Sequence, residues 1–177
     1  MEAEPATRAD WSGALVAKTG IRFFVRPAEP EDVAALGDFY ARLSLEDLRY
    51  RFLTAVREVG QARLIEMATV DHDRTENFLA FWADSDILVG SAMLVADEAR
   101  ERAEVAIAVR SDLKRRGIGA RLLMHVADYA EARGIRILES ISSADNWALI
   151  ELERRLGFTC RPLPDDASLV FLQRRLG

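Results

Sequence analysis

Hydrophobic residues change their spacing part-way along the chain, from a helical period to a strand period. In segment 31–43, apolar side chains recur every three or four positions, which predicts an amphipathic helix. A second helix is expected to begin after Ser44, a favourable N-cap residue, with Asp47 completing a variant of the capping box. A third, short helix is predicted at 61–68. The β-branched and aromatic run at 21–26 predicts a strand ahead of all three helices.

Apolar and polar residues alternate in the segments that follow, which predicts a meander of three strands. These segments are 77–83, 87–95 and 103–110. After them the pattern predicts a helix at 117–133, a strand at 136–142, a helix at 147–156 and a strand at 169–175. This order of elements indicates an α/β layer architecture with a mixed sheet.

The two later helices should each bury one face. The first begins at Gly117 and ends at Gly134, and its buried stripe is expected to consist of Ile118, Leu122, Val126 and Tyr129. The inward residues expected in the second are Leu149, Leu152 and Leu156.

Length and composition indicate one folded domain. The chain has 177 residues, of which 50% are hydrophobic and 30% charged, enough to bury a core without disulfides or metals. Residues 1–20 show no clear period and are expected to form a mobile or loosely docked tail, followed by a single domain at 21–177. A formal net charge of −5 argues against nucleic-acid binding through bulk electrostatics.

The sequence gives expectations about cellular location and about metal binding. No secretory signal and no membrane-length apolar run is visible, so a cytoplasmic protein is the default expectation. A single cysteine, Cys160, fits a reducing compartment and excludes an internal disulfide or a cysteine-based zinc site. His72 and His125 are too isolated to form a metal-binding cluster.

The segment Lys114–Gly119 (KRRGIG) combines three cations, two glycines and the start of a helix. Glycine lets a ligand approach the backbone, and the first N–H groups of a helix lack internal partners and carry the positive end of its dipole. This combination favours a diphosphate ligand. The spacing fits neither the nucleotide P-loop nor the dinucleotide fingerprint. The alternative is a glycine pair that only tightens a turn.

Glu104 is the candidate catalytic residue. In its strand, Glu104 shares one face with Ala106 and Ala108, while the branched residues that alternate with them face the core. The small side chains would leave space for a ligand beside a single carboxylate. The alternative is a strand-edge glutamate paired with Arg102.

These motifs resemble those of the GNAT superfamily of acetyl-CoA-dependent N-acetyltransferases. The main family motif is Gln/Arg-x-x-Gly-x-Gly/Ala, and Lys114 stands here at its first position. A second family motif, Asn-x-x-Ala-x-x-Leu-Tyr-x-x-x-Gly-Phe, is similar to the segment from Asn146 to Phe158, with Leu149 at its alanine. Glu153 occupies the position where many members carry a tyrosine that acts as general acid. The resemblance covers about 21–177 and implies a mostly antiparallel central sheet flanked by helices.

The resemblance implies acetyl-CoA as cosubstrate and no metal. The main motif would bind its diphosphate, and the preceding strand would pair with its pantetheine arm as with an added strand. The residues implied in cofactor binding are Ile107, Ala108, Val109, Lys114, Arg115, Arg116, Gly117, Ile118, Gly119, Ala120 and Asn146. A backbone N–H near Val109 would stabilise the developing oxyanion. The alternative role of Asn146 is to cap its helix.

The resemblance also implies that Glu104 is the general base for an amine acceptor. Three segments, 41–53, 69–74 and 102–110, are similar to the acetyltransferase domain of bacterial protein-lysine acetyltransferases, whose targets include acyl-CoA synthetases. The implied reaction is direct attack of a protein lysine on acetyl-CoA in a ternary complex. The alternatives are acetylation of a small amine or amino acid, and a non-catalytic acyl-CoA sensor. The chain is expected to be a monomer or homodimer.

Several other polar residues have simpler expected roles. His125 is expected on a helix face, Cys160 is not expected to be a covalent nucleophile, and His72 is a lesser candidate for acceptor contact. The first two helices carry an excess of acidic residues, which indicates either a solvated face or a steering surface for a basic partner.

Overall fold

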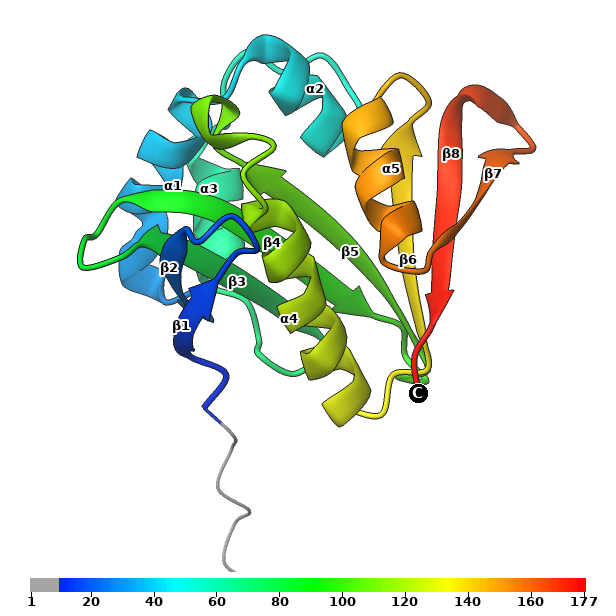
Figure 1. Cartoon of the computed structure of the whole chain (residues 1–177). Helices are drawn as coiled ribbons and strands as arrows, with labels where there is room; N and C mark the ends of the chain where they lie inside the picture. Colours follow the sequence, from blue (N-terminus) through cyan, green and yellow to red (C-terminus); the bar gives the residue numbers. More distant parts are fainter. Residues whose placement is uncertain (1–9) are drawn as a thin grey trace, which may run out of the picture.

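The structure is a computed structural model that describes residues 10–177. One eight-stranded sheet has the order β1-β2-β3-β4-β5-β6-β8-β7, and every neighbouring pair is antiparallel except β5 and β6 (Figure 1). The strands are β1 (Gly13–Val16), β2 (Arg22–Pro27), β3 (Thr75–Trp82), β4 (Leu88–Ala96), β5 (Arg102–Val109), β6 (Ile137–Ser143), β7 (Thr159–Leu163) and β8 (Asp166–Arg175). The predicted mixed, mostly antiparallel sheet is therefore confirmed.

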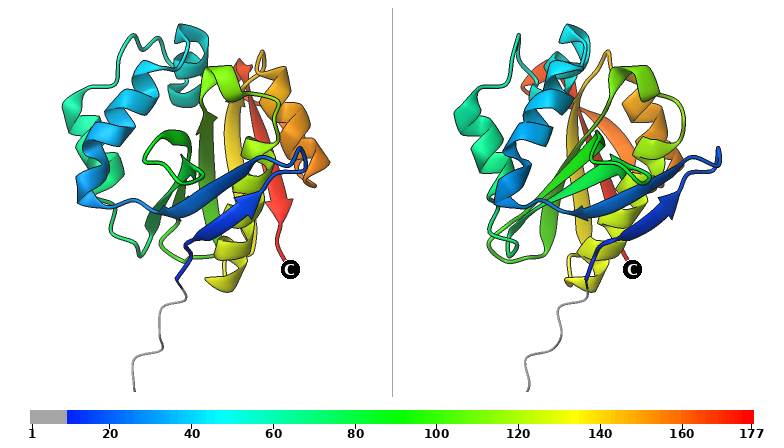
Figure 2. Two further views of the ribbon diagram at one scale, coloured as in Figure 1. Left: turned by 60° about the vertical axis from the view of Figure 1, so that its left-hand side comes forward. Right: turned by 90° about the vertical axis from the view of Figure 1, so that its left-hand side faces the viewer.

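Helices cover both faces of this sheet, and each side has its own hydrophobic core (Figure 2). One side holds α1 (Val33–Ala41), α2 (Leu45–Phe52) and α3 (Gln61–Ala68), and the other holds α4 (Ile118–Ala132) and α5 (Trp147–Arg155). Short 3-10 turns at Pro30–Asp32 and Ser111–Leu113 precede α1 and α4. The predicted helix at 31–43 is thus a 3-10 turn followed by a shorter α-helix.

The long helix α4 buries the predicted stripe. Ile118, Leu122, Val126 and Tyr129 are all buried against the sheet, as expected for a 3.6-residue period. Helix α5 is rotated from its predicted orientation. Its buried positions are Ile150 and Glu153, whereas the three predicted leucines are only half-buried. Periodicity misplaced this face because it cannot predict that a carboxyl-bearing residue will point inward.

The N-terminal region is more ordered than the sequence suggests. The expected tail at 1–20 includes β1, which pairs with β2, and Trp11, whose ring contacts Tyr129 with centroids 5.4 Å apart. The folded unit therefore begins before residue 21, and the part of the expected tail at 1–9 lies outside the described residues. Strand β7, also absent from the prediction, pairs with β8 at the other edge of the sheet.

Ser44 caps α2 as predicted. Its hydroxyl oxygen accepts a hydrogen bond from the Asp47 N–H at 3.1 Å. Asp47, however, does not close the predicted capping box, because its carboxylate binds residues ahead of α4 instead. Among the helices of residues 10–177, none has the length and apolar character needed to cross a bilayer.

Replacing Leu122 with alanine should lower the free energy of unfolding by about 2–5 kcal/mol, because the side chain is fully buried between α4 and the sheet. Met124→Ala on the same helix is the matched control, since Met124 is 40% exposed and should change stability by less than about 1 kcal/mol. Urea unfolding of both variants tests this. Equal losses would contradict the packing described here.

Candidate active site

The central feature of the site is a split between β5 and β6. Only Arg102–Glu104 of β5 pair with β6, opposite Ile137–Glu139. Beyond this point the strands diverge, β5 remaining paired with β4 and β6 with β8 (Figure 1). The split therefore opens at Glu104, and α2 contacts both strands beside it.

The split exposes main-chain hydrogen-bonding groups of β5. The Arg110 N–H donates to the Val89 carbonyl at 2.9 Å, which makes this a hydrogen-bonded pair of the β4–β5 ladder. In an antiparallel ladder such pairs alternate, so Val109 and Ile107 direct their N–H and C=O groups away from β4 and toward the split. Ala108 faces β4 with its main chain. The geometry therefore favours Ile107 and Val109 over Ala108 for main-chain contacts to an extended ligand.

The N-terminus of α4 offers further N–H groups. Gly117 is the N-cap residue with a φ of +84°, a conformation that favours glycine, and no side chain caps the helix within residues 10–177. The Arg121 N–H is bonded to the Gly117 carbonyl, so the preceding amides of Ile118, Gly119 and Ala120 lie ahead of the intrahelical ladder. These open amides are the groups for which the sequence pattern predicts anion binding.

Gly119 lets α4 pack closely on its neighbours. A Cβ atom at this position would lie 3.4 Å from Val109 Cγ2 and 3.5 Å from Leu152 Cδ1. A larger side chain would therefore push α4 away from β5 and α5. The glycine keeps the helix N-terminus next to the opening of the split.

The three predicted cations of this loop differ in their surroundings. Lys114 forms an ion pair with Asp47, so its charge is already matched. Arg115 and Arg116 are exposed and make no ion pair with any residue that the structure describes. The Thr19 hydroxyl donates to the Arg116 carbonyl and holds the loop backbone. The two arginines are therefore the cations free to meet a diphosphate.

Asp47 ties α2 to the loop before α4. Its carboxylate accepts a 2.5 Å hydrogen bond from the Ser111 hydroxyl as well as the bond from Lys114, and the Ser44 N–H donates to the same serine at 2.9 Å. Burial alone would raise the pKa of the Asp47 carboxyl, but the bonds from Lys114 and Ser111 outweigh it and lower that pKa. The acid is thus ionised and fixed. Asp32 is similarly engaged by Arg26 at 2.7 Å, so two of the acids of the proposed steering surface serve internal ion pairs.

Glu104 stands at the vertex of the split with its side chain exposed. The suggested partner Arg102 binds Glu139 of β6 instead, and Glu104 has no ion-pair or hydrogen-bond partner among residues 10–177. The alternative of an Arg102–Glu104 pair is therefore wrong. The predicted division of β5 faces is confirmed, since Val105, Ile107 and Val109 pack with the α4 side and Ala108 with the other.

Glu153 of α5 carries a buried carboxyl group, which the sequence pattern did not predict. It stands at the position where the family motif described above has tyrosine. Its residue is 1% exposed, and its Oε2 atom has no hydrogen-bond partner in the part of the chain described. Burial raises the pKa of Glu153 to about 7, and the Ser140 hydroxyl offsets part of that rise. Glu104 and Glu153 thus differ in environment: Glu104 is exposed on one face of the sheet, and Glu153 is buried on the other.

The remaining candidate residues have structural partners. The Asn146 Oδ1 atom accepts from the Leu149 N–H at 3.4 Å, so the helix-cap role is observed. His125 lies on α4 with its Nε2 atom 3.1 Å from the Trp11 carbonyl, and His72 bonds to Glu76 at 2.9 Å. Cys160 is a half-buried free thiol on β7. No group of three or more residues suited to a metal ion occurs within residues 10–177.

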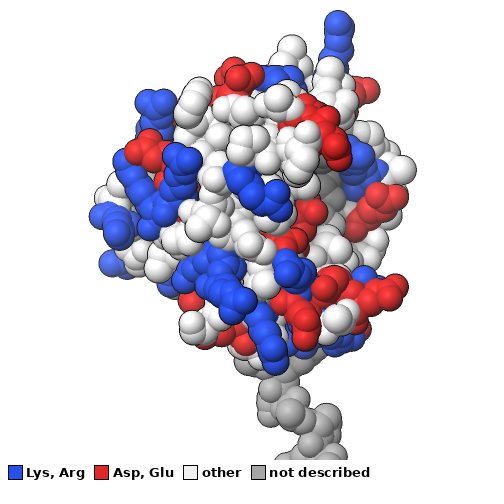
Figure 3. All heavy atoms as spheres, turned by 90° about the vertical axis from the view of Figure 1, so that its right-hand side faces the viewer, with Lys and Arg blue, Asp and Glu red and all other residues white. Residues whose placement is uncertain are grey.

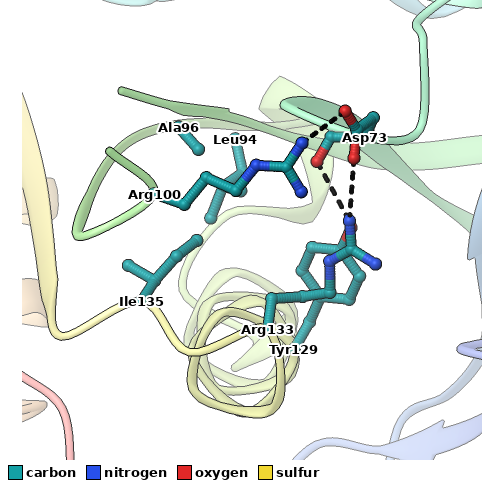
Figure 4. Close-up of a pocket in the computed structure, with 7 residues that line it drawn as sticks. All are labelled: Asp73, Leu94, Ala96, Arg100, Tyr129, Arg133 and Ile135. Atoms are coloured by element: carbon teal, nitrogen blue, oxygen red, sulfur yellow. Dashed lines mark hydrogen bonds and ion pairs between the residues drawn. The ribbon is translucent and has the colours of Figure 1, made fainter. Parts of the chain in front are cut away.

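Two cavities lie away from the split. One of about 10 Å³, room for a single water, is closed by Asp73, which binds Arg100 at 2.6 Å and Arg133 at 3.4 Å (Figure 4). These ion pairs fasten the loop before β3 to the loop after β4 and to the end of α4. A larger pocket of about 350 Å³ lies among α1, α2 and the loop that follows α2, with Arg57 and Glu58 at its rim.

Comparison with known proteins gives the family. The acetyltransferase (GNAT) family matches residues 40–158, a range that includes the split, the loop before α4 and α5. The chain belongs to this family. It is therefore an N-acetyltransferase, and the earlier resemblance is confirmed.

Three similar proteins agree with this assignment. The acetyltransferase PA5475 of Pseudomonas aeruginosa is 30% identical over 153 residues, which cover 85% of this chain and 82% of that protein. Acetyltransferase Pat of Mycolicibacterium smegmatis is 30% identical over 145 residues, 79% of this chain but 42% of Pat. The GNAT domain of S. lividans PAT has the same fold, with a TM-score of 0.88 and 23% identity over 97% of this chain and 100% of that domain.

The residues of this GNAT chain fit acetyl-CoA, the cosubstrate typical of the family. The open amides at the start of α4 suit a diphosphate, as do Arg115 and Arg116, which form no ion pair with the residues described. The main chain of Ile107 and Val109 suits an extended amide-bearing arm. The α4 N-terminus and the split lie side by side because Gly119 packs against Val109.

Stability should depend on pH through Glu153. Its folded-state pKa of about 7 lies above the ordinary 4.5, so the folded state binds the proton more tightly, and the free energy of unfolding falls as pH rises from about 4.5 to 7. The loss should reach about 3 kcal/mol by pH 8. Glu153→Gln stays neutral and should escape this loss.

Urea unfolding at pH 5, 6, 7 and 8 measures the effect. Glu151→Gln is the matched control, because Glu151 lies on the same helix with an exposed side chain and should retain the wild-type dependence. Parallel profiles for the wild type and Glu153→Gln would show that Glu153 does not titrate in this range.

Proposed function

We propose that the chain transfers the acetyl group of acetyl-CoA to the side-chain amine of a lysine in a protein acceptor, with an acyl-CoA synthetase as the first candidate. The observation that carries this proposal is the carboxylate of Glu104, which is exposed at the vertex of the β5–β6 split and has no partner among the residues that the structure describes. Similarity to Pat and to the GNAT domain of PAT supports a protein acceptor.

The proposed cofactor site uses the two features that flank the split. Amides of Ile118, Gly119 and Ala120, with the Arg115 and Arg116 side chains, would bind the diphosphate. The main chain of Ile107 and Val109 would bind the extended arm. Acetyl-CoA would supply the acetyl thioester at the inner end of that arm.

Deprotonation of the acceptor is the step that needs Glu104. A lysine amine with a pKa near 10.4 is neutral in fewer than about one molecule in 10³ at pH 7, a cost of about 4–5 kcal/mol. Glu104 would accept its proton directly or through a water. The structure leaves this side chain exposed at the vertex of the split, where an acceptor can reach it. The neutral amine would then attack the thioester carbonyl, and the Val109 N–H, which points into the split, would stabilise the developing oxyanion. Collapse of this tetrahedral intermediate would break the C–S bond, so that CoA leaves as a thiolate and takes up a proton.

The acceptor class is tested by incubating the full chain with labelled acetyl-CoA and a panel of acyl-CoA synthetases, small amines and free amino acids. Mass spectrometry of the proteins should find acetylated lysine side chains. If only the small amines or amino acids were acetylated, the proposal of a protein acceptor would be wrong and a small-molecule acceptor would take its place. Tight acetyl-CoA binding without transfer to any amine would indicate an acyl-CoA sensor.

Glu104→Gln should lower kcat by about 10²-fold or more while leaving acetyl-CoA affinity nearly unchanged, because it removes the base but not the cofactor contacts. Glu98→Gln, an exposed substitution in the loop of the same hairpin, is the control and should keep wild-type turnover. Steady-state kinetics and calorimetric titration with CoA separate the two effects. Unchanged turnover in Glu104→Gln would remove this residue from the mechanism.

A further inference from the structure

Arg51, near the end of α2, is a cation with no anionic partner in the described part of the chain. Its Nε atom is buried and has no hydrogen-bond partner within residues 10–177. Its Nη2 atom lies 3.9 Å from the Met93 sulfur, a weak acceptor, and the side chain makes no ion pair with any described residue. Arginine stays charged at every physiological pH, so this guanidinium is left under-satisfied.

The acids on α2 cannot supply the missing partner. Asp47 is bound by Lys114 and Ser111, and Glu46 accepts a hydrogen bond from Tyr50. A second cation increases the local positive charge, because Arg63 of α3 lies over the Phe52 ring at 4.8 Å while Arg51 lies over the same ring at 5.0 Å. The stacking holds the Arg51 guanidinium in place and leaves its charge unmatched.

The position of Arg51 links it to Glu104. Met93 is in register with Ala106, which shares a sheet face with Glu104 two residues earlier on β5. Arg51 therefore lies over the sheet face that carries Glu104. Along β5, Ala106 and Glu104 are about 7 Å apart at the level of the backbone. Val95, directly opposite Glu104, is 44% exposed, so this part of the face is open to solvent.

We propose that Arg51 binds a carboxylate carried by the acceptor, next to the amine that Glu104 deprotonates. The inference rests on the proposed function and names the chemistry of its substrate: an amine with a carboxylate nearby. A guanidinium is suited to this group because it donates two parallel hydrogen bonds to both oxygens. The carboxylate comes either from the main-chain terminus of an amino acid or from an acidic side chain beside the lysine.

The proposed diphosphate site and Arg51 belong to opposite faces of the sheet. The start of α4 packs in the core on one face of the sheet, whereas Met93, beneath Arg51, packs with the helices on the other. The surface beside β7 and β8 carries charges of both signs mixed together (Figure 3). A face with both signs mixed produces little long-range field of either sign.

Two pairs of probes separate the sources of the carboxylate. Nα-acetyl-lysine is compared with its methylamide, which lacks the carboxylate, and a Lys-Glu peptide is compared with its Lys-Gln counterpart. Binding of each probe to protein saturated with CoA is measured by calorimetry, and acetylation of each is measured by kcat/KM. The binding measurement does not require transfer, so it tests Arg51 even if the proposed acetylation fails.

At least one carboxylate probe should bind about tenfold more tightly than its neutral partner in the wild type, and its kcat/KM should be higher by a similar factor. Arg51→Gln should abolish the difference while leaving CoA affinity unchanged, and Arg51→Lys should retain only part of it. Arg49→Gln is the matched control, since Arg49 lies exposed on the same helix, over Tyr50, and should keep the full preference.

Equal binding of both members of each pair by the wild type would overturn the proposal without any variant. A preference that survives in Arg51→Gln, or a loss of CoA affinity in that variant, would also overturn it. A preference for one pair only identifies the source of the carboxylate. Absence of acetylation together with an Arg51-dependent binding preference would refute the proposed transfer and leave the assignment of Arg51 standing.

Discussion

The divergence of β5 and β6 beyond Glu104 is the constraint on which the rest of the site depends. Two neighbouring parallel strands normally satisfy each other's main-chain groups, and here they do so for only three residues of β5. The unpaired length then needs a ligand or water to complete its hydrogen bonds. The divergence sets the position of both the proposed site for the cofactor arm and the proposed base, because Glu104 is the last residue of β5 that pairs with β6.

The elements around the split are held by polar contacts rather than by apolar packing alone. Asp47 connects α2 to the loop that leads into α4, so the helix bearing Arg51 and the proposed diphosphate loop are fixed relative to each other. This contact uses one of the three cations predicted to bind the cofactor. An acid placed close to a diphosphate site would repel the ligand, and Lys114 neutralises it. Lys114 therefore has two roles: it joins the loop to α2, and it neutralises the negative charge of Asp47 beside the proposed diphosphate site.

The sequence predicts those parts of the fold whose pattern is local. The alternation in β5 and the 3.6-residue stripe of α4 are strong periodic signals, and the glycines of the loop identify the anion-binding helix end. Strands β1 and β7 escaped prediction because they are short edge strands whose pairing with β2 and β8 provides their order. The partners of Asp47 and the burial of Glu153 depend on segments distant in sequence. Arg51 gave no signal at all, since an arginine on an amphipathic helix looks like any other solvated charge.

The split also has a consequence for the molecule without its cosubstrate. A row of free N–H and C=O groups in the middle of a sheet is an edge, and edges accept any extended segment, including one from another copy of the chain. In most sheets such edges lie at the periphery, where charged residues or bulges protect them. Here the edge is internal and forms the proposed binding site of the cofactor arm, so under that proposal it cannot be blocked permanently. A bound pantetheine arm would occupy these main-chain groups and so prevent another segment from pairing with them. Self-association of the chain would therefore be most favoured when the cellular supply of acyl-CoA is low.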